Sequence, residues 1–152
     1  MKRVIAAVLL LVLMLSACGG SASVTVDLAS VKQTMISDLQ IVDPLDVPAE
    51  RLVDLYNIPV ESIKTSACFI TMGGAFPDEI VMVEAVDAKA AQEIAQKLEA
   101  RLADVTNQAQ NYDADSFALL KACKVETAGN YVHLFISAKS AQMREIFDAA
   151  KK

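Results

Sequence analysis

The apolar residues of this chain follow two different patterns. Residues 4–15 form an unbroken apolar run, whereas from residue 28 onward the apolar positions recur at the intervals of helices and strands. The run of 12 residues is too short for a membrane-spanning helix, which needs about 20. The periodic part predicts one packed domain, because 152 residues suffice for a single ordinary domain and are too few for two.

Several segments carry the spacing of amphipathic helices. Asp27, Asp87 and Ser137 are suitable N-caps, and Pro48 suits the first turn of a short helix. In the longest helix the predicted buried stripe is Ala91, Ile94, Ala95, Leu98, Leu102 and Val105. The predicted helices are 28–40, a short one around 52–56, 88–108, a helical turn at 117–122, and a last helix after Ser137.

Two further regions have the pattern of β-hairpins. The first joins strand 63–72 to strand 79–86 through a turn with Gly73-Gly74, and the second joins 123–127 to 131–136 through residues 128–130. Each hairpin is followed by a helix. This order predicts an α+β domain over 27–152, with a four-stranded, mainly antiparallel sheet and helices packed on it.

The two hairpin–helix units are similar in sequence. Residues 67–74 align with 122–129, and residues 80–92 align with 130–142, with seven identities in 21 positions. Two explanations are open. One is an internal repeat, and the other is two similar solutions to one packing problem, since a hairpin backed by a helix is a common unit.

The N-terminal run is typical of a secretion signal. It follows the basic pair Lys2 and Arg3 and ends at Leu15-Ser16-Ala17-Cys18, which resembles the bacterial lipobox. In a lipobox the Cys thiol receives a diacylglycerol and the peptide is cut just before it. We therefore expect residues 1–17 to be a signal peptide, Cys18 to be lipidated, and residues 18–26 to form a tether at the extracytoplasmic face of the cell membrane.

The charge of the chain limits its partners. The formal net charge is −5, and removal of Lys2 and Arg3 with the signal peptide lowers it to −7. An acidic domain is repelled by nucleic acid and by anionic lipid headgroups. We therefore expect no nucleic-acid binding and attribute membrane attachment to lipid rather than to charge.

Short motifs in the domain resemble a known family. They are Gly129-Asn130-Tyr131-Val132 in the second hairpin, Asp78-Glu79-Ile80 before the second strand, and Tyr112. Together with the lipobox they resemble a bacterial lipoprotein family described as a domain of unknown function, of Gram-positive type. The resemblance covers roughly residues 27–150 and implies no established activity or site residues. It implies a neighbourhood of genes for acylation of cell-envelope polymers, and hence an accessory role in cell-wall polymer modification.

Two cysteines remain in the domain after Cys18. Cys68 and Cys123 take matching places in the aligned units, so a disulfide between them is one interpretation. Two buried free thiols are the other, since each cysteine alternates with apolar neighbours. A metal site is disfavoured because the sequence has no CxxC motif and only one histidine.

That histidine, His133, shares one side of its strand with Tyr131 and Phe135. If this side is open, the row is an aromatic binding face for a sugar or a peptide. If a helix covers it, the row belongs to the core. Asp78 and Glu79 are expected in a solvated turn, since they lack the alternating Asp and Asn of a calcium loop.

These features favour a non-catalytic binding module of the cell envelope, whose partner is a protein or a wall polymer. No catalytic set, phosphate loop or metal motif is present in the sequence, so we expect no enzymatic activity, no cofactor and no metal. The alternatives are a small envelope enzyme with a site around Cys123 and His133, and an accessory protein of wall-polymer modification.

Overall fold

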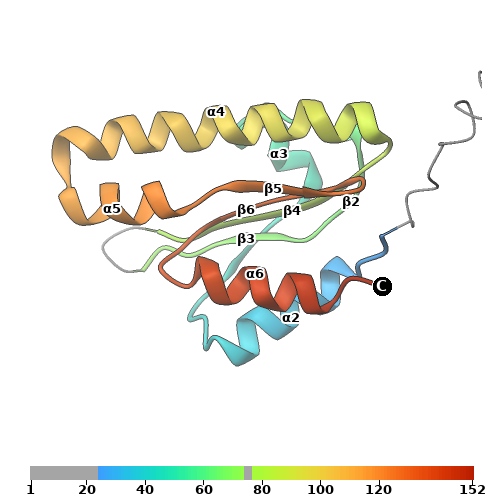
Figure 1. Cartoon of the computed structure of the whole chain (residues 1–152), viewed down its shortest axis with the longest axis horizontal. Helices are drawn as coiled ribbons and strands as arrows, with labels where there is room; N and C mark the ends of the chain where they lie inside the picture. The colour runs from blue at the N-terminus through green and yellow to red at the C-terminus, as the bar shows by residue number, and fades with distance from the viewer. Residues whose placement is uncertain (1–23, 74–76) are drawn as a thin grey trace, which may run out of the picture.

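The computed structural model describes residues 24–73 and 77–152. The predicted signal peptide, Cys18 and most of the tether lie outside these residues, as do positions 74–76 of the first hairpin turn. In the described part, helices cover both faces of an antiparallel sheet (Figure 1). The predicted α+β class is therefore confirmed.

The helices and strands keep the predicted order, with additions. The helices are α2 (Leu28–Asp38), α3 (Leu52–Tyr56), α4 (Ala88–Tyr112), α5 (Ala114–Ala122) and α6 (Ser140–Ala149), with short 3-10 helices η2 (Ala49–Arg51) and η3 (Val60–Ser62). The strands are β1 (Leu45–Val47), β2 (Ile63–Ser66), β3 (Cys68–Ile70), β4 (Glu79–Ala85), β5 (Val125–Ala128) and β6 (Tyr131–Ile136).

The predicted count of four strands is wrong, because the sheet has six within residues 24–73 and 77–152. The strand expected over 63–72 is divided at Ala67 into β2 and β3, and both pair with the same edge of β4. Ala67 still donates its N–H to the carbonyl oxygen of Met82 at 3.0 Å. The unexpected strand is β1, three residues between Pro44 and Pro48 that pair with β3. Three residues are too few to show alternation, so only a partner distant in sequence reveals this strand.

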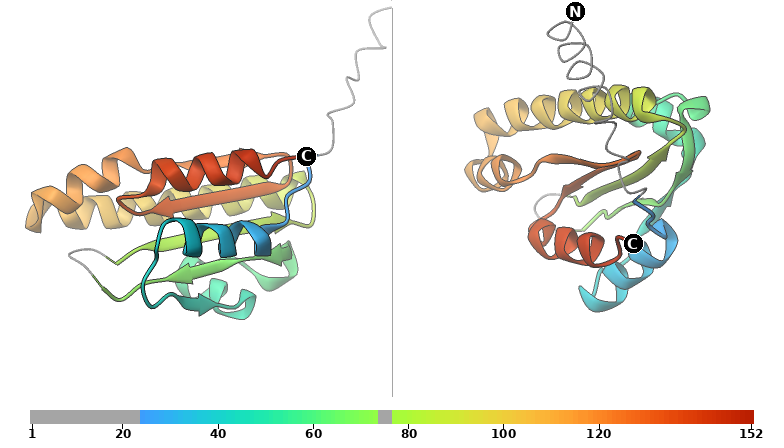
Figure 2. Two further views of the ribbon diagram at one scale, coloured as in Figure 1. Left: turned by 90° about the horizontal axis from the view of Figure 1, so that it is seen from below. Right: turned by 45° about the vertical axis from the view of Figure 1, so that its right-hand side comes forward.

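The sheet runs in the order β1-β3-β4-β6-β5, and every pairing is antiparallel. The central strands β4 and β6 are buried at nearly every position, as expected for a sheet covered on both faces. Alternate residues of each strand contribute to two separate cores. One core contains Val81 and Leu134 and faces α3, α4 and α5, and the other contains Met82 and Phe135 and faces α2 and α6. Figure 2 shows α2 and α6 lying together on that second face.

Several predicted boundaries are shifted. Helix α4 continues to Tyr112, and α5 follows at once because the carboxylate of Asp113 accepts the N–H groups of Asp115 and Ser116. Helix α6 begins at Ser140 rather than just after Ser137, whose hydroxyl oxygen instead accepts the N–H of Lys139 at 3.0 Å. Strand β6 matches its predicted bounds.

The folded domain begins earlier than Asp27. Val26 is buried, and Thr25 exchanges two backbone hydrogen bonds of 3.1 Å with Lys152. The tether predicted over 18–26 is therefore shortened at its C-terminal end, because Thr25 and Val26 pack into the domain. The internal repeat stays a prediction: the structure repeats the order hairpin then helix but places α4 and α6 on opposite faces of the sheet.

Candidate functional site

The aromatic row on β6 is buried under α6. Tyr131, His133 and Phe135 are each at most 3% exposed. The His133 ring stacks on Phe135 at a centroid distance of 4.6 Å and meets Phe147 of α6 at 4.2 Å. The interpretation of this row as an open binding face is therefore wrong, and the alternative of a row covered by a helix holds.

His133 is also a poor candidate for a general base. Its Nδ1 atom is buried without a hydrogen-bond partner. Burial is the main cause that lowers the pKa of His133 to about 4, and the nearby charges of Glu126, Lys151, Asp148 and Arg144 partly cancel. The side chain is thus neutral at physiological pH and belongs to the apolar packing of α6 on the sheet.

The two cysteines are free and buried in the structure. Cys68 Sγ donates to the carbonyl oxygen of Met82 at 3.5 Å, and burial raises the pKa of its thiol to about 11. Cys123 Sγ donates to the carbonyl oxygen of Leu119 at 3.4 Å, and burial raises its pKa as well. The structure thus shows the second of the two interpretations, buried free thiols. No hydrogen bond joins Cys123 to His133 among the described residues.

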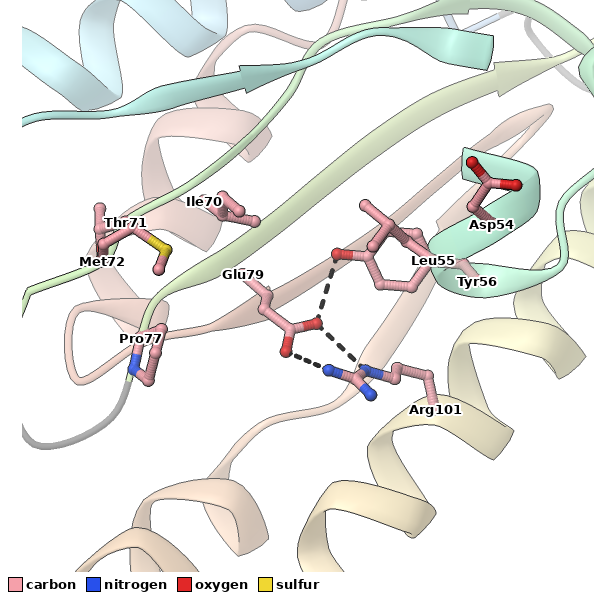
Figure 3. Close-up of a pocket in the computed structure, with 9 residues that line it drawn as sticks. All are labelled: Asp54, Leu55, Tyr56, Ile70, Thr71, Met72, Pro77, Glu79 and Arg101. Atoms are coloured by element: carbon pink, nitrogen blue, oxygen red, sulfur yellow. Dashed lines mark hydrogen bonds and ion pairs between the residues drawn. The ribbon is translucent and has the colours of Figure 1, made fainter. Parts of the chain in front are cut away.

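A different site lies where β3 ends and β4 begins. There the structure has a pocket of about 440 Å³, a size within the range of small-ligand sites. We call it the ion-pair pocket. It is lined by Asp54, Leu55 and Tyr56 of α3, Ile70 of β3, Thr71, Met72 and Pro77 of the connection, Glu79 of β4 and Arg101 of α4 (Figure 3).

The polar half of the ion-pair pocket is centred on Glu79, which is 13% exposed. Its Oε1 accepts from Arg101 Nη2 at 2.5 Å, and its Oε2 accepts from Arg101 Nε at 3.2 Å. Tyr56 also donates its hydroxyl to Oε2 at 3.3 Å. Both carboxylate oxygens are therefore occupied, and the bidentate pairing fixes the plane of the guanidinium group.

Local sequence explains why these three side chains meet. Glu79 is on the same side of β4 as Val81, so it faces α4. Arg101 follows Ile94 and Leu98 at helical spacing on the side of α4 that faces the sheet. Tyr56 is the last residue of α3. The next residue, Asn57, caps the helix in the left-handed conformation with φ of 56°.

The charges in this cluster are mutually compensated. The hydrogen bond to Glu79 is the main cause that raises the pKa of Arg101. Burial, followed by the charge of Glu79, raises the pKa of Tyr56 well above its usual value. Glu79 is thus paired on both oxygens by Arg101 and Tyr56, and Tyr56 stays protonated.

The other half of the pocket is apolar and open. Leu55 is 41% exposed and Met72 is 72% exposed, which is high for large apolar side chains. Ile70 and Pro77 also line the pocket, and Figure 3 shows Ile70, Met72 and Pro77 on one side of Glu79 and Leu55 on the other, beside Tyr56. Thr71 is buried, and its hydroxyl is engaged by the N–H and carboxylate of Asp78. The arrangement can hold a ligand with an apolar body and one group that accepts hydrogen bonds.

Arg101 supplies the donors for such a group. A guanidinium has five N–H groups, and Glu79 accepts two of those of Arg101. The side chain is 36% exposed and lines the pocket, so its remaining N–H groups are available to a ligand. Within residues 24–73 and 77–152, no three His, Cys, Asp or Glu side chains gather as a metal site would require.

Comparison with known proteins assigns the chain to a family. A match to the family described as Domain of unknown function (DUF4358) covers residues 37–137. The chain belongs to this family. The match confirms the resemblance to a domain of unknown function, and the lipobox lies outside the matched residues.

The site of this DUF4358 domain lies entirely within the matched residues. No curated protein and no solved structure shows significant similarity to the chain. In the described part of the domain, no helix is long and apolar enough to span a bilayer.

Sequence reasoning did not bring together the three hydrogen-bonded side chains of the ion-pair pocket, those of Tyr56, Glu79 and Arg101. Asp78 and Glu79 were expected in a solvated turn, but Glu79 is the first residue of β4 and is largely buried. One available signal was Arg101, which lies between Leu98 and Val105 on the apolar stripe of α4. A charged residue in such a stripe requires a partner of opposite charge beneath it.

A second hollow lies between α2 and α6. Its volume is about 550 Å³, and it is bordered by Asp27 at the N-cap of α2, by Ser30, Thr34 and Asp38 of α2, and by Ile146 of α6, among others. The polar groups here are already engaged locally: Ser30 donates to Asp27 at 2.9 Å, and Thr34 donates to the carbonyl oxygen of Ser30 at 3.0 Å. This hollow therefore offers a ligand fewer hydrogen-bonding groups than the ion-pair pocket does.

Proposed function

We propose that the chain is an envelope lipoprotein whose domain is a non-catalytic binding module. In this proposal lipid on Cys18 holds it at the extracytoplasmic face of the cell membrane, and the ion-pair pocket receives the partner. The observation that carries the proposal is the pocket itself, in which a fixed Glu79–Arg101 pair stands beside exposed Leu55 and Met72.

The chemistry of the described titratable groups supports binding over catalysis. An activated nucleophile needs a base within hydrogen-bond reach or a lowered pKa. The pKa values of Cys68 and Cys123 are raised instead, and that of His133 is lowered by burial. The alternative of an enzyme site around Cys123 and His133 thus has no supporting contact among the described residues. An accessory role in wall-polymer modification remains compatible with a binding module.

The position of Thr25 supports a short tether. Because the backbone of Thr25 is hydrogen-bonded to that of Lys152, the chain is fixed to the domain directly after Val24. Six residue steps separate Cys18 from Val24, which limits that span to about 21 Å at about 3.5 Å per residue. A lipid on Cys18 would therefore keep the domain close to the membrane surface.

A photo-crosslinking experiment in cells tests the binding proposal. A photoreactive amino acid is placed at Met72 in the pocket wall or, as a matched control, at Val60, which is 48% exposed and does not line the pocket. We expect a discrete adduct from position 72 and none of that kind from position 60. Leu55→Asp should abolish the adduct because it places a charge in the apolar wall.

Two further variants separate binding from catalysis. Cys123→Ala and His133→Leu should leave the adduct from position 72 unchanged, because neither residue lines the pocket. Equal adducts from positions 60 and 72 would contradict the proposal. Loss of cellular function in folded Cys123→Ala or His133→Leu protein would support the enzyme alternative.

A further inference from the structure

The polar half of the ion-pair pocket is suited to an uncharged acceptor group. Glu79 already has both oxygens occupied, so a cationic ligand group would compete with Arg101 for it. Arg101 is the only cation that lines the described pocket, against the carboxylates of Asp54 and Glu79. Asp54 pairs with Arg51, which does not line the pocket, and Glu79 pairs with Arg101. An anionic group therefore meets a site without free positive charge and gains little there. A neutral carbonyl oxygen needs only the free N–H groups of Arg101.

The apolar half favours a peptide over a sugar. Its exposed wall is made of aliphatic and thioether groups from Leu55, Ile70, Met72 and Pro77. Sugars are usually held by exposed aromatic faces, whereas Tyr56, the only aromatic residue lining the pocket in the described chain, is buried. Methionine is typical of surfaces that adapt to varied apolar side chains.

The location of the pocket favours a partner away from the anchor. Val24 lies beside the β5–β6 turn, because a Cβ on Gly129 would be 3.8 Å from Val24 Cβ. Ala85 is at the same end, since it donates its N–H to Asn130 at 2.8 Å. Glu79 is at the opposite end of β4, six residues and about 20 Å away. Figure 1 shows the C-terminus at the end of the sheet opposite the start of β4.

We infer that the ion-pair pocket binds an uncharged apolar peptide segment of a partner protein, on the side of the domain away from the membrane. A main-chain carbonyl of the segment accepts from Arg101, and an aliphatic side chain enters between Leu55 and Met72. This inference rests on the proposed function and narrows its partner to a protein.

Defined photoreactive peptides test this ligand class on the lipidated protein in phosphatidylcholine vesicles. Three capped tetrapeptides each carry one diazirine-bearing leucine and differ at one position, which is alanine, aspartate or lysine. We expect the neutral peptide to give the most adduct, and mass spectrometry to place it at Leu55, Met72 or Pro77. A glycerol phosphate oligomer added in excess should not reduce the adduct.

Variants relate the adduct to the pocket. Arg101→Met should lower the neutral-peptide adduct about tenfold, as expected for loss of hydrogen bonds to a charged donor. Arg144→Met is the matched control. It removes a guanidinium of α6 that pairs with Glu126 of β5, and it should leave the adduct unchanged. Met72→Asp tests the same pocket at an exposed position where the fold does not depend on the side chain.

The outcomes are distinguishable from failure of the proposed function. Preferential labelling by the charged peptides, competition by glycerol phosphate, or adducts outside the pocket would overturn the inference. So would equal labelling of the wild type and Met72→Asp. If the cellular adduct from position 72 persists while these peptides fail, or if that adduct is lipid or polymer, the peptide class is wrong and a binding module stands. If both experiments fail, the proposed function falls as well.

Discussion

Glu79 is the one polar residue in the row of β4 that faces α4, where Val81, Val83 and Ala85 are its neighbours. A carboxylate in such a place is tolerated only when its charge is paired and its oxygens are hydrogen-bonded. Arg101 and Tyr56 meet that requirement. The same contacts hold the guanidinium group in place at the wall of the pocket.

Replacing Glu79 should therefore destabilise the domain. Glu79→Gln leaves the partly buried Arg101 without its charged partner, and we expect the free energy of unfolding to fall by about 1–3 kcal/mol. Urea denaturation measures this change. Glu93→Gln is the control, since its pair with Lys89 is solvent-exposed and should matter by less than about 0.5 kcal/mol. Equal effects of the two substitutions would contradict a structural role for the partly buried Glu79–Arg101 pair.

His133 makes the stability of the domain depend on pH. The pKa of its ring is about 4 in the folded domain and about 6.5 in an unfolded chain, so the unfolded state binds the proton more readily between these values. Stability should be constant above about pH 6.5 and fall as the pH drops toward 4, by at most about 3 kcal/mol. The carboxylates of Asp27, Asp113 and Asp148, whose pKa values are lowered, lose their contribution only below that window.

His133→Leu should remove this dependence. An apolar side chain of similar size cannot be protonated and replaces a buried Nδ1 that has no partner. Denaturant unfolding at several pH values should show a flat stability between about pH 6.5 and 4 for the variant and a slope for the wild type. An equal slope in both proteins would assign the pH dependence to other groups.

At the scale of elements, helix α6 makes β6 part of the core. Phe147 is fully buried and lies against both His133 and Phe135. Met143 and Phe147 therefore exclude water from the row that would otherwise be an open aromatic face. The docking of α6, rather than the sequence of β6, decides the environment of His133.

Phe147→Ala should expose His133 as well as destabilise the fold. We expect a loss of about 3–5 kcal/mol and a rise in the pKa of His133 from about 4 toward 6.5, because water gains access to the ring. NMR titration is direct, since the chain has a single histidine. Phe117→Ala on α5 is the control, because it removes the same ring from the core on the other face of the sheet. In this variant the pKa of His133 should stay near 4. An unchanged pKa in Phe147→Ala would mean that α6 is not what buries the ring.

Elements defined by local periodicity could be predicted from the sequence. Strand β6 and the start of α4 behind Asp87 lie where the apolar spacing places them. Strand β1 could not be predicted, because its three residues become a strand only through pairing with β3. The ion-pair pocket could not be predicted from the sequence for the same reason. Tyr56, Glu79 and Arg101 come from three elements and meet only after the sheet and α4 are assembled.

At the scale of the whole molecule, the two ends of the sheet have different surroundings. The Thr25–Lys152 pair and the β5–β6 turn lie at the end nearest the start of the folded chain, and the ion-pair pocket lies at the other. Under the proposed function, lipid on Cys18 would hold the first end near the membrane and leave the pocket directed outward. The acidic charge of the domain is repelled by an anionic surface, so lipid rather than charge would hold it there.

The mass of the mature protein tests the lipid-anchored account most directly. Protein extracted from the membrane fraction and measured intact should begin at Cys18 and exceed the mass of residues 18–152 by that of a diacylglycerol group. Cys18→Ser protein should lack this addition and should not be cut before position 18. A wild-type chain of unmodified mass, or a Cys18→Ser chain that is processed and retained like the wild type, would contradict the account.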